Sequence, residues 1–366
     1  MNEPLFEKTK IGTMELKNRF VRSATWEGMA GAGGEVTTPL IELYSELARG
    51  EVGLILTGFS YVNIKGKAVP AMMGADSDMH IPGLKKLTAA VHKAGGKIAL
   101  QIAHGGSQCN FDTGLGTEAP SAVKERSTGN MPKPMSRADI KRVISDFAEA
   151  ARRAKESGFD AVEIHAAHGY LLSQFLSPFS NQRTDAYGGT IKKRARIVTD
   201  VYEAVREKVG PDFPVMIKIN SADFDEVGLT PEDSVWVCKR LSKLGIDAIE
   251  LSGGLPASTP KTPARLKIDT PEKEAYFKDY AKGLKPLIKC PLILVGGLRS
   301  IEVIEGLYDD GTADFFSLAR PLISEPDLIK RWHSGDREKG RCISCNKCMT
   351  NAFTEARLYC SLDTEG

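Results

Sequence analysis

The stretch Gly158-Phe-Asp-Ala-Val-Glu-Ile164 returns almost unchanged as Gly245-Ile-Asp-Ala-Ile-Glu-Leu251, and a looser copy spans residues 311–318. Each copy follows an amphipathic stretch. Before the first copy, Ser136 and Asp139 have the spacing of a helix capping box, and apolar residues follow at helical intervals. The glycine that opens each copy suits a helix end, and the apolar residues after it suit a short strand. Helix, glycine turn and strand in repetition indicate the alternation of a parallel α/β sheet.

Eight short apolar runs along the chain have the character of strands. They are Phe20–Ser23, Gly53–Leu56, Lys97–Ile102, Asp160–Ile164, Val215–Ile219, Asp247–Leu251, Leu292–Val295 and Asp314–Leu318. About eight strands in roughly 300 residues is what a closed (β/α)8 TIM barrel requires. An open, doubly wound sheet is the alternative, but it predicts a G-x-G-x-x-G turn after an early strand, and we find none.

Two segments are too long for tight connections. Residues 103–135 are rich in Gly, Pro, Ser and Thr, and residues 166–190 form a second long connection. We expect both to be loops over the barrel mouth, after strands three and four, because long functional loops lie at the C-terminal ends of barrel strands. The expected organisation is one barrel domain over residues 1–340, with a cysteine-containing tail, residues 341–366, packed on it.

Composition excludes several classes of function. The chain has 366 residues, and its 49 basic residues nearly balance 47 acidic ones, for a net charge of +2. Such a balance, without a basic run, gives no electrostatic case for nucleic acid. No apolar run approaches the roughly 20 residues of a membrane helix, and the first residues contain no apolar signal segment. Seven sparse cysteines do not suit a disulfide framework, so we expect a cytoplasmic protein with reduced thiols.

Catalytic groups of a barrel come from the C-terminal ends of different strands. Those ends carry Thr25, Gly58, Gln101, His165, His168, Tyr170, Lys218, Ser252, Gly296, Gly297, Ala319 and Arg320. The polar groups from the early strands can bond a planar heterocycle. The last two strands offer a Gly-Gly turn and an arginine, which suit phosphate, because glycine admits close backbone N–H groups and arginine binds phosphate in a bidentate manner. The set favours a flavin site over a metal site.

Two longer motifs make the comparison specific. The segment His165-Ala-Ala-His-Gly-Tyr-Leu-Leu-Ser-Gln-Phe-Leu-Ser-Pro178, followed by Asn181-Gln-Arg-Thr-Asp-Ala-Tyr-Gly-Gly189, resembles the signature of the old yellow enzyme family. This family is the NADH:flavin oxidoreductase group of FMN-dependent ene-reductases. Shorter matches are Leu5-Phe6, Lys17-Asn-Arg-Phe20, Gln101-Ile-Ala-His-Gly-Gly106 and Val295-Gly-Gly297, so the resemblance covers essentially the whole chain.

The resemblance implies a role for each matching residue. His165 and His168 would bind the carbonyl oxygen of an α,β-unsaturated substrate, where negative charge develops, and Tyr170 would protonate Cα. A tyrosine of ordinary pKa, about 10, stays protonated at neutral pH and can act as the acid. The flavin ring would contact Ala24, Thr25, Gly58 and Gln101, with Lys218 in place of the family's usual arginine, and the phosphate would contact Gly296, Gly297, Ala319 and Arg320.

The implied activity is ping-pong reduction of an enone-type small molecule, with FMN as cofactor and NAD(P)H as reductant. Two alternatives stay open: a flavin dehydrogenase or demethylase of the same family acting on a ring amine or steroid, and a non-flavin phosphosugar-binding barrel with Lys218 as Schiff base. His165 and His168 could also be metal ligands if their segment were helical, but no carboxylate or third histidine stands at a neighbouring strand end. Assembly into a homo-oligomer is left open.

The C-terminal cysteines form a separate pattern. Cys342, Cys345 and Cys348 make two C-x-x-C turns that share one residue, and Cys360 follows. Iron–sulfur proteins use this spacing, and four thiolates also suit structural zinc. Longer family members that resemble 2,4-dienoyl-CoA reductase carry a [4Fe–4S] cluster here, with one more residue between the second and third cysteine and a second flavin domain as electron donor. The sequence therefore leaves a cluster, zinc and free thiols as alternatives.

Overall fold

A computed structural model of the protein describes residues 3–111 and 113–363. Eight parallel strands form a sheet that closes on itself, because the last strand pairs with the first. They are β3 (Phe20–Arg22), β4 (Leu54–Leu56), β6 (Ile98–Ala103), β9 (Ala161–Ala166), β10 (Val215–Asn220), β11 (Ala248–Ser252), β12 (Leu292–Val295) and β13 (Phe315–Leu318). The expected (β/α)8 TIM barrel is confirmed, with strand ends displaced by at most two residues. Residues 1–2 and 112 of the expected barrel domain, and residues 364–366 of the expected tail, lie outside the described part.

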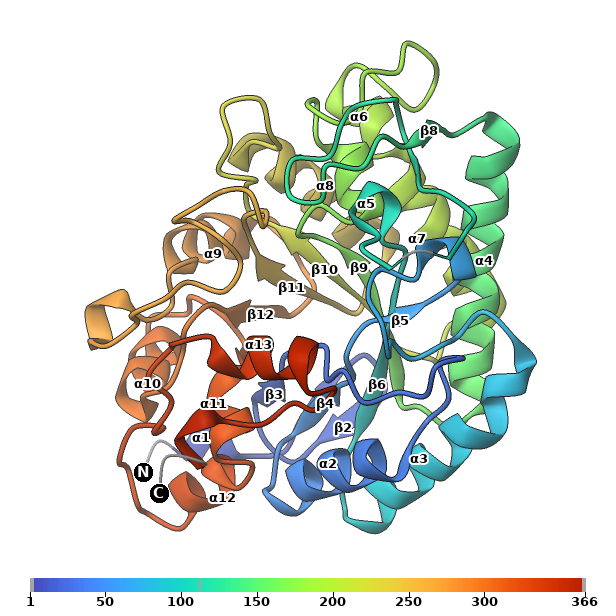
Figure 1. Ribbon diagram of the computed structural model, residues 1–366. Helices are drawn as coiled ribbons and strands as arrows, with labels where there is room; N and C mark the ends of the chain where they lie inside the picture. Colours follow the sequence, from blue (N-terminus) through green and yellow to red (C-terminus); the bar gives the residue numbers. More distant parts are fainter. Residues whose placement is uncertain (1–2, 112, 364–366) are drawn as a thin grey trace.

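Helices surround this barrel (Figure 1). They are α1 (Glu3–Phe6), α2 (Thr38–Arg49), α3 (Ile81–Lys93), α4 (Arg137–Glu156), α5 (Leu171–Leu176), α6 (Ile191–Arg194), α7 (Arg196–Val209), α8 (Pro231–Leu244), α9 (Lys278–Leu284), α10 (Ile301–Asp309), α11 (Arg320–Ser324), α12 (Leu328–His333) and α13 (Lys347–Thr354). Short strands outside the barrel are β1 (Thr9–Ile11), β2 (Met14–Leu16), β5 (Ser60–Tyr61), β7 (Glu118–Ala119) and β8 (Lys133–Pro134). The capping box expected before α4 is present, with the Ser136 hydroxyl accepting from the Asp139 N–H and the Asp139 carboxylate accepting from the Ser136 N–H.

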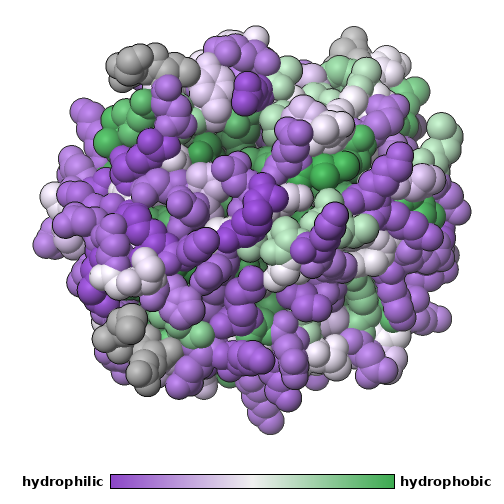
Figure 2. All heavy atoms as spheres, turned by 90° about the horizontal axis from the view of Figure 1, so that it is seen from below, coloured by the Kyte–Doolittle hydropathy of each residue, from purple (hydrophilic) through white to green (hydrophobic). Residues whose placement is uncertain are grey.

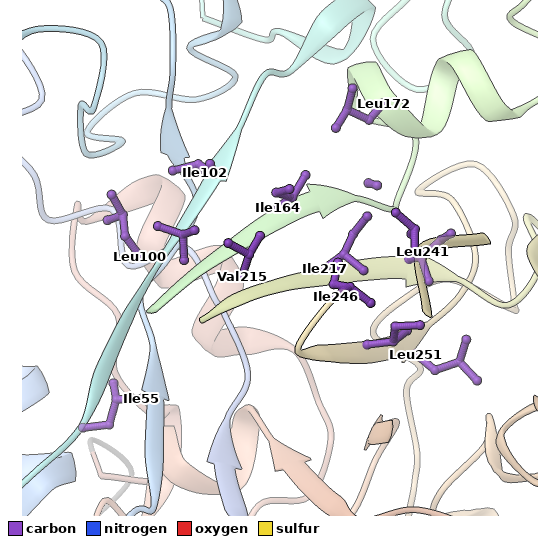
Figure 3. Close-up of a cluster of buried hydrophobic side chains, with 14 of the residues drawn as sticks. Ile55, Leu100, Ile102, Ile164, Leu172, Val215, Ile217, Leu241, Ile246 and Leu251 are labelled. Atoms are coloured by element: carbon purple, nitrogen blue, oxygen red, sulfur yellow. The ribbon is translucent and has the colours of Figure 1, made fainter. Parts of the chain in front are cut away.

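Side chains along each barrel strand alternate between two environments, as the two-residue period of a strand requires. One set, including Leu54, Ala99, Ala161, Met216 and Ala248, forms an apolar cluster inside the barrel. The residues between them pack outward against the helices; Figure 3 shows Ile55, Leu100, Ile164, Val215, Ile217 and Leu251 in this layer. The next inward positions toward the carboxyl ends are polar: Gln101, Glu163, Lys218 and Glu250. The repeated phrase therefore places a carboxyl group inside the barrel in both of its close copies.

An antiparallel hairpin of β1 and β2 completes the apolar interior. Its residues Ile11, Met14 and Leu16 are buried and belong to the same cluster as the lower strand residues. Burying apolar surface is favourable, so this hairpin seals the amino-terminal side of the barrel with a dry layer. Chemistry is thereby confined to the polar layer and the opposite, carboxyl face.

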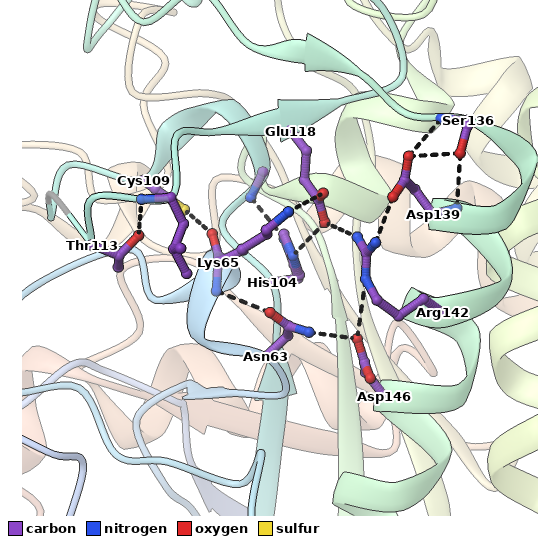
Figure 4. Close-up of polar contacts among 12 residues, drawn as sticks. Asn63, Lys65, His104, Cys109, Thr113, Glu118, Ser136, Asp139, Arg142 and Asp146 are labelled. Carbon is purple, nitrogen blue, oxygen red and sulfur yellow. Dashed lines mark hydrogen bonds and ion pairs between the residues drawn. The ribbon is translucent and has the colours of Figure 1, made fainter.

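The long connection after β6 is held to the neighbouring helix α4 by ion pairs and hydrogen bonds. It contains the short parallel pair β7 and β8, and Glu118 of β7 accepts a hydrogen bond of 2.6 Å from Arg142 of α4. The buried His104 ring lies 3.4 Å from the same carboxylate, and Asn63 donates to Asp146 of α4 at 2.8 Å (Figure 4). The loop expected over the barrel mouth is thus fixed to an outer helix.

The residues after α12 return across the carboxyl face, where Figure 1 places α13 in front of β3 and β4. Cys348, Ala352 and Leu358 pack with Trp26 in one small apolar cluster. Gly28 has a φ of +69°, and a side chain there would meet the Ala352 carbonyl at 2.6 Å, so glycine permits this close approach. The C-terminal segment therefore contributes to the same face of the barrel as the strand ends.

The outer surface is mostly hydrophilic on the side seen in Figure 2, with hydrophobic groups in separate patches. Within the described residues, no helix combines the length and apolar character that crossing a membrane requires.

Candidate active site

A cavity of about 380 Å³ opens at the carboxyl ends of the barrel strands. Its size lies in the range of roughly 300–1,000 Å³ that is usual for small-molecule and cofactor sites. Predicted site residues that line it are Ala24, Thr25, Gln101, His165, His168, Tyr170, Lys218, Gly297, Ala319 and Arg320. The structure therefore brings together, in one cavity, side chains drawn from most of the barrel strands.

Two predicted residues lie behind the cavity wall. The Gly58 N–H donates to Glu27 Oε1 and to the Tyr44 hydroxyl, and a side chain at position 58 would meet the Glu27 carboxylate. Gly296 accepts a backbone hydrogen bond from Tyr276. Both glycines shape the wall, and neither lines the cavity.

His165, His168 and Tyr170 form one cluster at the end of β9. The His165 ring lies 4.9 Å from the Tyr170 ring and 5.2 Å from the His168 ring, both edge to face. His168 has a φ of 59°, which is uncommon for a residue with a side chain. Its N–H donates to Asn220 Oδ1, and its Nε2 lies 2.7 Å from the Ser252 hydroxyl. These two contacts hold the strained turn that places both imidazoles on one wall.

The protonation states of this cluster follow from its burial. Burial, with the nearby Lys218 ammonium, lowers the pKa of His165 and His168 well below the ordinary value, so both rings are neutral. The Ala167 N–H donates to His165 Nδ1, which places the ring hydrogen of His165 on Nε2. Burial, with a smaller effect of Cys109, raises the Tyr170 pKa above its ordinary value. The phenol is thus protonated at neutral pH, as the sequence predicted, although its pKa is not an ordinary one.

Lys218 occupies the polar layer at the base of the cavity. Its side chain is 3% exposed, and its Nζ lies 3.0 Å from Glu250 Oε2 and donates to the Ser23 hydroxyl at 2.8 Å. The ammonium is therefore a fixed positive charge at the cavity, held from behind by a buried carboxylate.

The end of the cavity formed by β12 and β13 is suited to phosphate. Gly297 has a φ of +76°, and a side chain there would meet the Tyr276 ring at 2.9 Å. Arg320 Nη1 is held by Asn346 Oδ1 at 2.7 Å. Arg299, which sequence reasoning missed, also lines this end, and its buried Nε has no hydrogen-bond partner among the described residues. The Arg299 guanidinium is held by the Cys342 and Asp269 carbonyls and lies 3.7 Å from Glu274 Oε1, so Arg320 is the stronger phosphate candidate of the two.

Other lining residues were also missed. Trp26 and Phe59 stand beside predicted residues, and Met349 and Phe353 come from α13. The Trp26 and Phe353 rings are 4.4 Å apart, and the buried Trp26 Nε1 has no hydrogen-bond partner within the described residues. The large aromatic side chain directly after Thr25 was a usable signal. Nothing in the tail pattern indicated that α13 would form part of the cavity wall.

The four C-terminal cysteines do not converge as metal ligands. Within residues 3–111 and 113–363, no three His, Cys, Asp or Glu side chains meet in an arrangement that could hold a metal ion. Cys342, Cys348 and Cys360 are buried and Cys345 is exposed, all as free thiols. Burial raises the pKa of Cys348 to about 11, with the neighbouring cysteines adding to the shift. Among the alternatives left open for these cysteines, this geometry favours free thiols over a cluster or zinc, and it does not support metal-bound histidines.

Comparison with known proteins shows the family. The sequence profile of the NADH:flavin oxidoreductase / NADH oxidase family matches residues 4–339. The chain belongs to this family. The resemblance to old yellow enzymes is confirmed as well: the solved old yellow enzyme homologue from Zymomonas mobilis superposes with a TM-score of 0.78 at 28% identity, over 92% of this chain and 94% of that one.

Two longer relatives are also similar. A metal reductase of Desulforamulus reducens is 36% identical over 99% of this chain and 53% of its own length. A solved 2-naphthoyl-CoA reductase complex superposes with a TM-score of 0.90 at 28% identity, over 98% of this chain and 56% of that one. The chain thus spans about half the length of these relatives.

Proposed function

We propose that this protein uses NAD(P)H to reduce the C=C bond of an α,β-unsaturated carbonyl compound, with FMN as cofactor. The observation that carries the proposal is the wall at the end of β9, where two neutral imidazoles and one protonated phenol line the same cavity. Reduction of an enone needs hydrogen-bond donors for the carbonyl oxygen and a proton for Cα. This trio supplies both.

The residues present fit FMN. The cavity has the size of a cofactor site, with polar strand residues along its base and Arg299 and Arg320 at one end. Gly297 and Arg320 line the same end of the cavity, and a glycine backbone N–H and a guanidinium are groups that bind phosphate. When bound, FMN supplies the hydride chemistry between the nicotinamide and the substrate. Ala24, Thr25, Gln101 and Lys218 would face the flavin ring, with Ala319 beside the phosphate.

The chain's own groups account for the remaining chemistry. The Nε2–H of His165, together with His168, would donate to the substrate oxygen on which negative charge develops. Tyr170 would transfer its proton to Cα, after which solvent restores it. The Ser252 hydroxyl fixes the His168 ring, so the two imidazoles are oriented before substrate arrives. We leave a [4Fe–4S] cluster out of the proposal, because the cysteine thiols do not form a ligand set.

An absorbance spectrum and an anaerobic half-reaction test this proposal. The purified protein is expected to be yellow, to release FMN on denaturation, and to be bleached by NADH or NADPH. The reduced protein should then be rapidly reoxidised by a cyclic enone under anaerobic conditions. A colourless protein that takes up no FMN would overturn the flavin site. Bleaching by a ring amine, without reoxidation by any enone, would replace the ene-reductase with the dehydrogenase alternative.

A further inference from the structure

Glu163 and Glu250 are fully buried carboxyl groups that the proposed function does not use. They occupy equivalent places in the two close copies of the repeated phrase, and both point into the barrel one layer above its apolar floor. Neither lines the cavity, but each is in register with a residue that does. Gln101 of β6 pairs with Glu163 of β9, and Lys218 of β10 pairs with Glu250 of β11.

The contacts connect these pairs into one network. Gln101 Nε2 donates to Glu163 Oε2 at 2.6 Å. Lys218 Nζ lies 3.0 Å from Glu250 Oε2, and the Ser23 hydroxyl donates to Glu250 Oε1 at 2.8 Å. Each carboxyl group thus stands directly behind one polar side chain of the cavity base.

The charges in this layer do not balance if both carboxyl groups are ionised. Two carboxylates against the single Lys218 ammonium would leave one uncompensated negative charge in the barrel interior, which is costly. The hydrogen bonds are incomplete as well. Glu163 Oε1 and Glu250 Oε2 are buried, and neither has an aligned hydrogen-bond partner among the described residues, although Lys218 is close to the second oxygen.

One proton between the two carboxyl groups resolves both problems. It neutralises the excess charge and gives each of these two oxygens a hydrogen-bond partner. The electrostatics indicate which group carries it. Burial, followed by the negative charge of Glu250, raises the Glu163 pKa well above its ordinary value. The Glu250 pKa is lowered, because Lys218 and the hydrogen bonds it accepts outweigh the opposite effect of burial.

We propose that Glu163 and Glu250 are positioning residues that share one proton, carried by Glu163, and that together they orient the Gln101 amide and the Lys218 ammonium toward the flavin. The Gln101 amide donates to the Glu163 carbonyl oxygen, the Glu163 hydroxyl donates to Glu250, and Glu250 holds the ammonium. The donor and the acceptor of each hydrogen bond in this layer are then determined, and Gln101 Oε1 is free to accept a hydrogen bond from the flavin ring. The part that concerns the flavin rests on the proposed FMN site.

Two variants of Glu163 distinguish this arrangement from a structural role. Glu163→Gln is nearly isosteric and neutral, with an amide that donates to Glu250 while its oxygen accepts from Gln101. Glu163→Leu keeps the volume and removes both hydrogen bonds. Glu118→Gln is the matched control, because Glu118 is another buried carboxyl group but lies outside the barrel, and His104 and Arg142 lower its pKa against the effect of burial. The measurements are the infrared carbonyl band of protonated carboxyl groups, the dissociation constant of FMN and the FMN reduction potential.

The infrared band of a buried carboxylic acid should be present in wild-type apoprotein and in Glu118→Gln, and absent from Glu163→Gln. Glu163→Gln should retain the FMN dissociation constant and potential of the wild type. Glu163→Leu should weaken FMN binding about tenfold or more, as expected for an unpaired buried amide.

The FMN potential of Glu163→Gln could instead differ from that of the wild type by about 30 mV, which is a tenfold change in the ratio of oxidised to reduced FMN for a two-electron couple. Such a shift would mean that the substitution had removed an ionised carboxylate, and it would overturn the shared proton. Equal FMN affinity in the Leu and Gln variants would overturn the positioning role. If the band is lost in Glu163→Gln but no variant or wild type takes up FMN, the shared proton stands and the proposed function fails.

Discussion

Replacing Lys218 with methionine removes the only cation within hydrogen-bonding reach of Glu250 in the described structure. The Lys218 side chain is 3% exposed and the Glu250 side chain 0%, and Lys218 Nζ lies 3.0 Å from Glu250 Oε2. The carboxylate left in the variant would therefore be buried without its partner. Breaking such a pair costs about 3–5 kcal/mol. With an unfolding entropy of about 2.1 cal/mol/K per residue over the 366 residues, this corresponds to a fall in Tm of roughly 4–6 °C. Calorimetry of the flavin-free protein at neutral pH measures this fall.

The fall in Tm caused by Lys218→Met should depend on pH in a defined direction. Lys218 contributes to a Glu250 pKa below the ordinary value, and a carboxyl group of lowered pKa stabilises the fold above its unfolded pKa of about 4.3. That contribution is lost as pH falls through the folded value. The Tm difference between wild type and Lys218→Met should therefore be full at neutral pH and shrink as the pH falls below about 4. In the FMN-bound protein, removing the positive charge should also lower the flavin reduction potential.

Lys218→Arg is the control for this prediction, since it keeps the charge. It should retain most of the stability and the potential, with a smaller loss where the fork of the guanidinium replaces a point charge. A Lys218→Met protein that melts within 1 °C of wild type at neutral pH (a loss below about 0.8 kcal/mol) would refute the reasoning. So would a Tm difference that grows on acidification.

The remaining predictions concern the cavity and the tail. Tyr170→Phe should keep FMN and its reduction by NAD(P)H but slow reoxidation by an enone at least ~10²-fold, about 2.7 kcal/mol, in stopped flow; an unchanged rate would remove the tyrosine from the mechanism. A para-substituted phenol should bind the oxidised protein with a long-wavelength charge-transfer band, and replacing His165 and His168 together should abolish it; persistence of the band at similar affinity would place the anion clamp elsewhere. Anaerobically purified protein should contain less than about one iron per chain, with no gain on reconstitution, and a content near four irons would contradict this reading of the C-terminal thiols.

The architecture was predictable because it repeats. Helix, glycine and strand recur along the chain, and the period-two alternation of β6 or β9 admits only one assignment of inward and outward residues. The residues at the strand ends then follow from the fold, which is why the sequence alone could place Gln101, His165 and Arg320 at the barrel mouth. Family resemblance added the roles of the histidines and the tyrosine.

What escaped prediction depends on long-range packing. Gly58 follows a strand as expected, but Glu27 and Tyr44 cover its N–H from the far side, and no local pattern reports this. Phe353 reaches the cavity only because α13 folds back over it. The carboxyl groups of Glu163 and of its counterpart in the second copy were visible in the quoted repeat from the start. A charged residue in the middle of an apolar strand was the signal that they face a polar interior.

The two-layered interior of the barrel separates what evolution can change from what it must keep. On β6, Ala99 fills the dry lower layer and Gln101, two residues on, belongs to the polar one. Side chains in the upper layer can therefore be exchanged, and the chemistry changed, while the lower layer and the β1–β2 hairpin beneath it keep the barrel intact. Drift below is restrained by volume, since a methylene more or less is felt in a close-packed layer. Substitution in the upper, polar layer is restrained by the need to balance charge and to give each buried polar group a hydrogen-bond partner. Substitutions at neighbouring inward positions of one strand are therefore restrained by two different physical requirements.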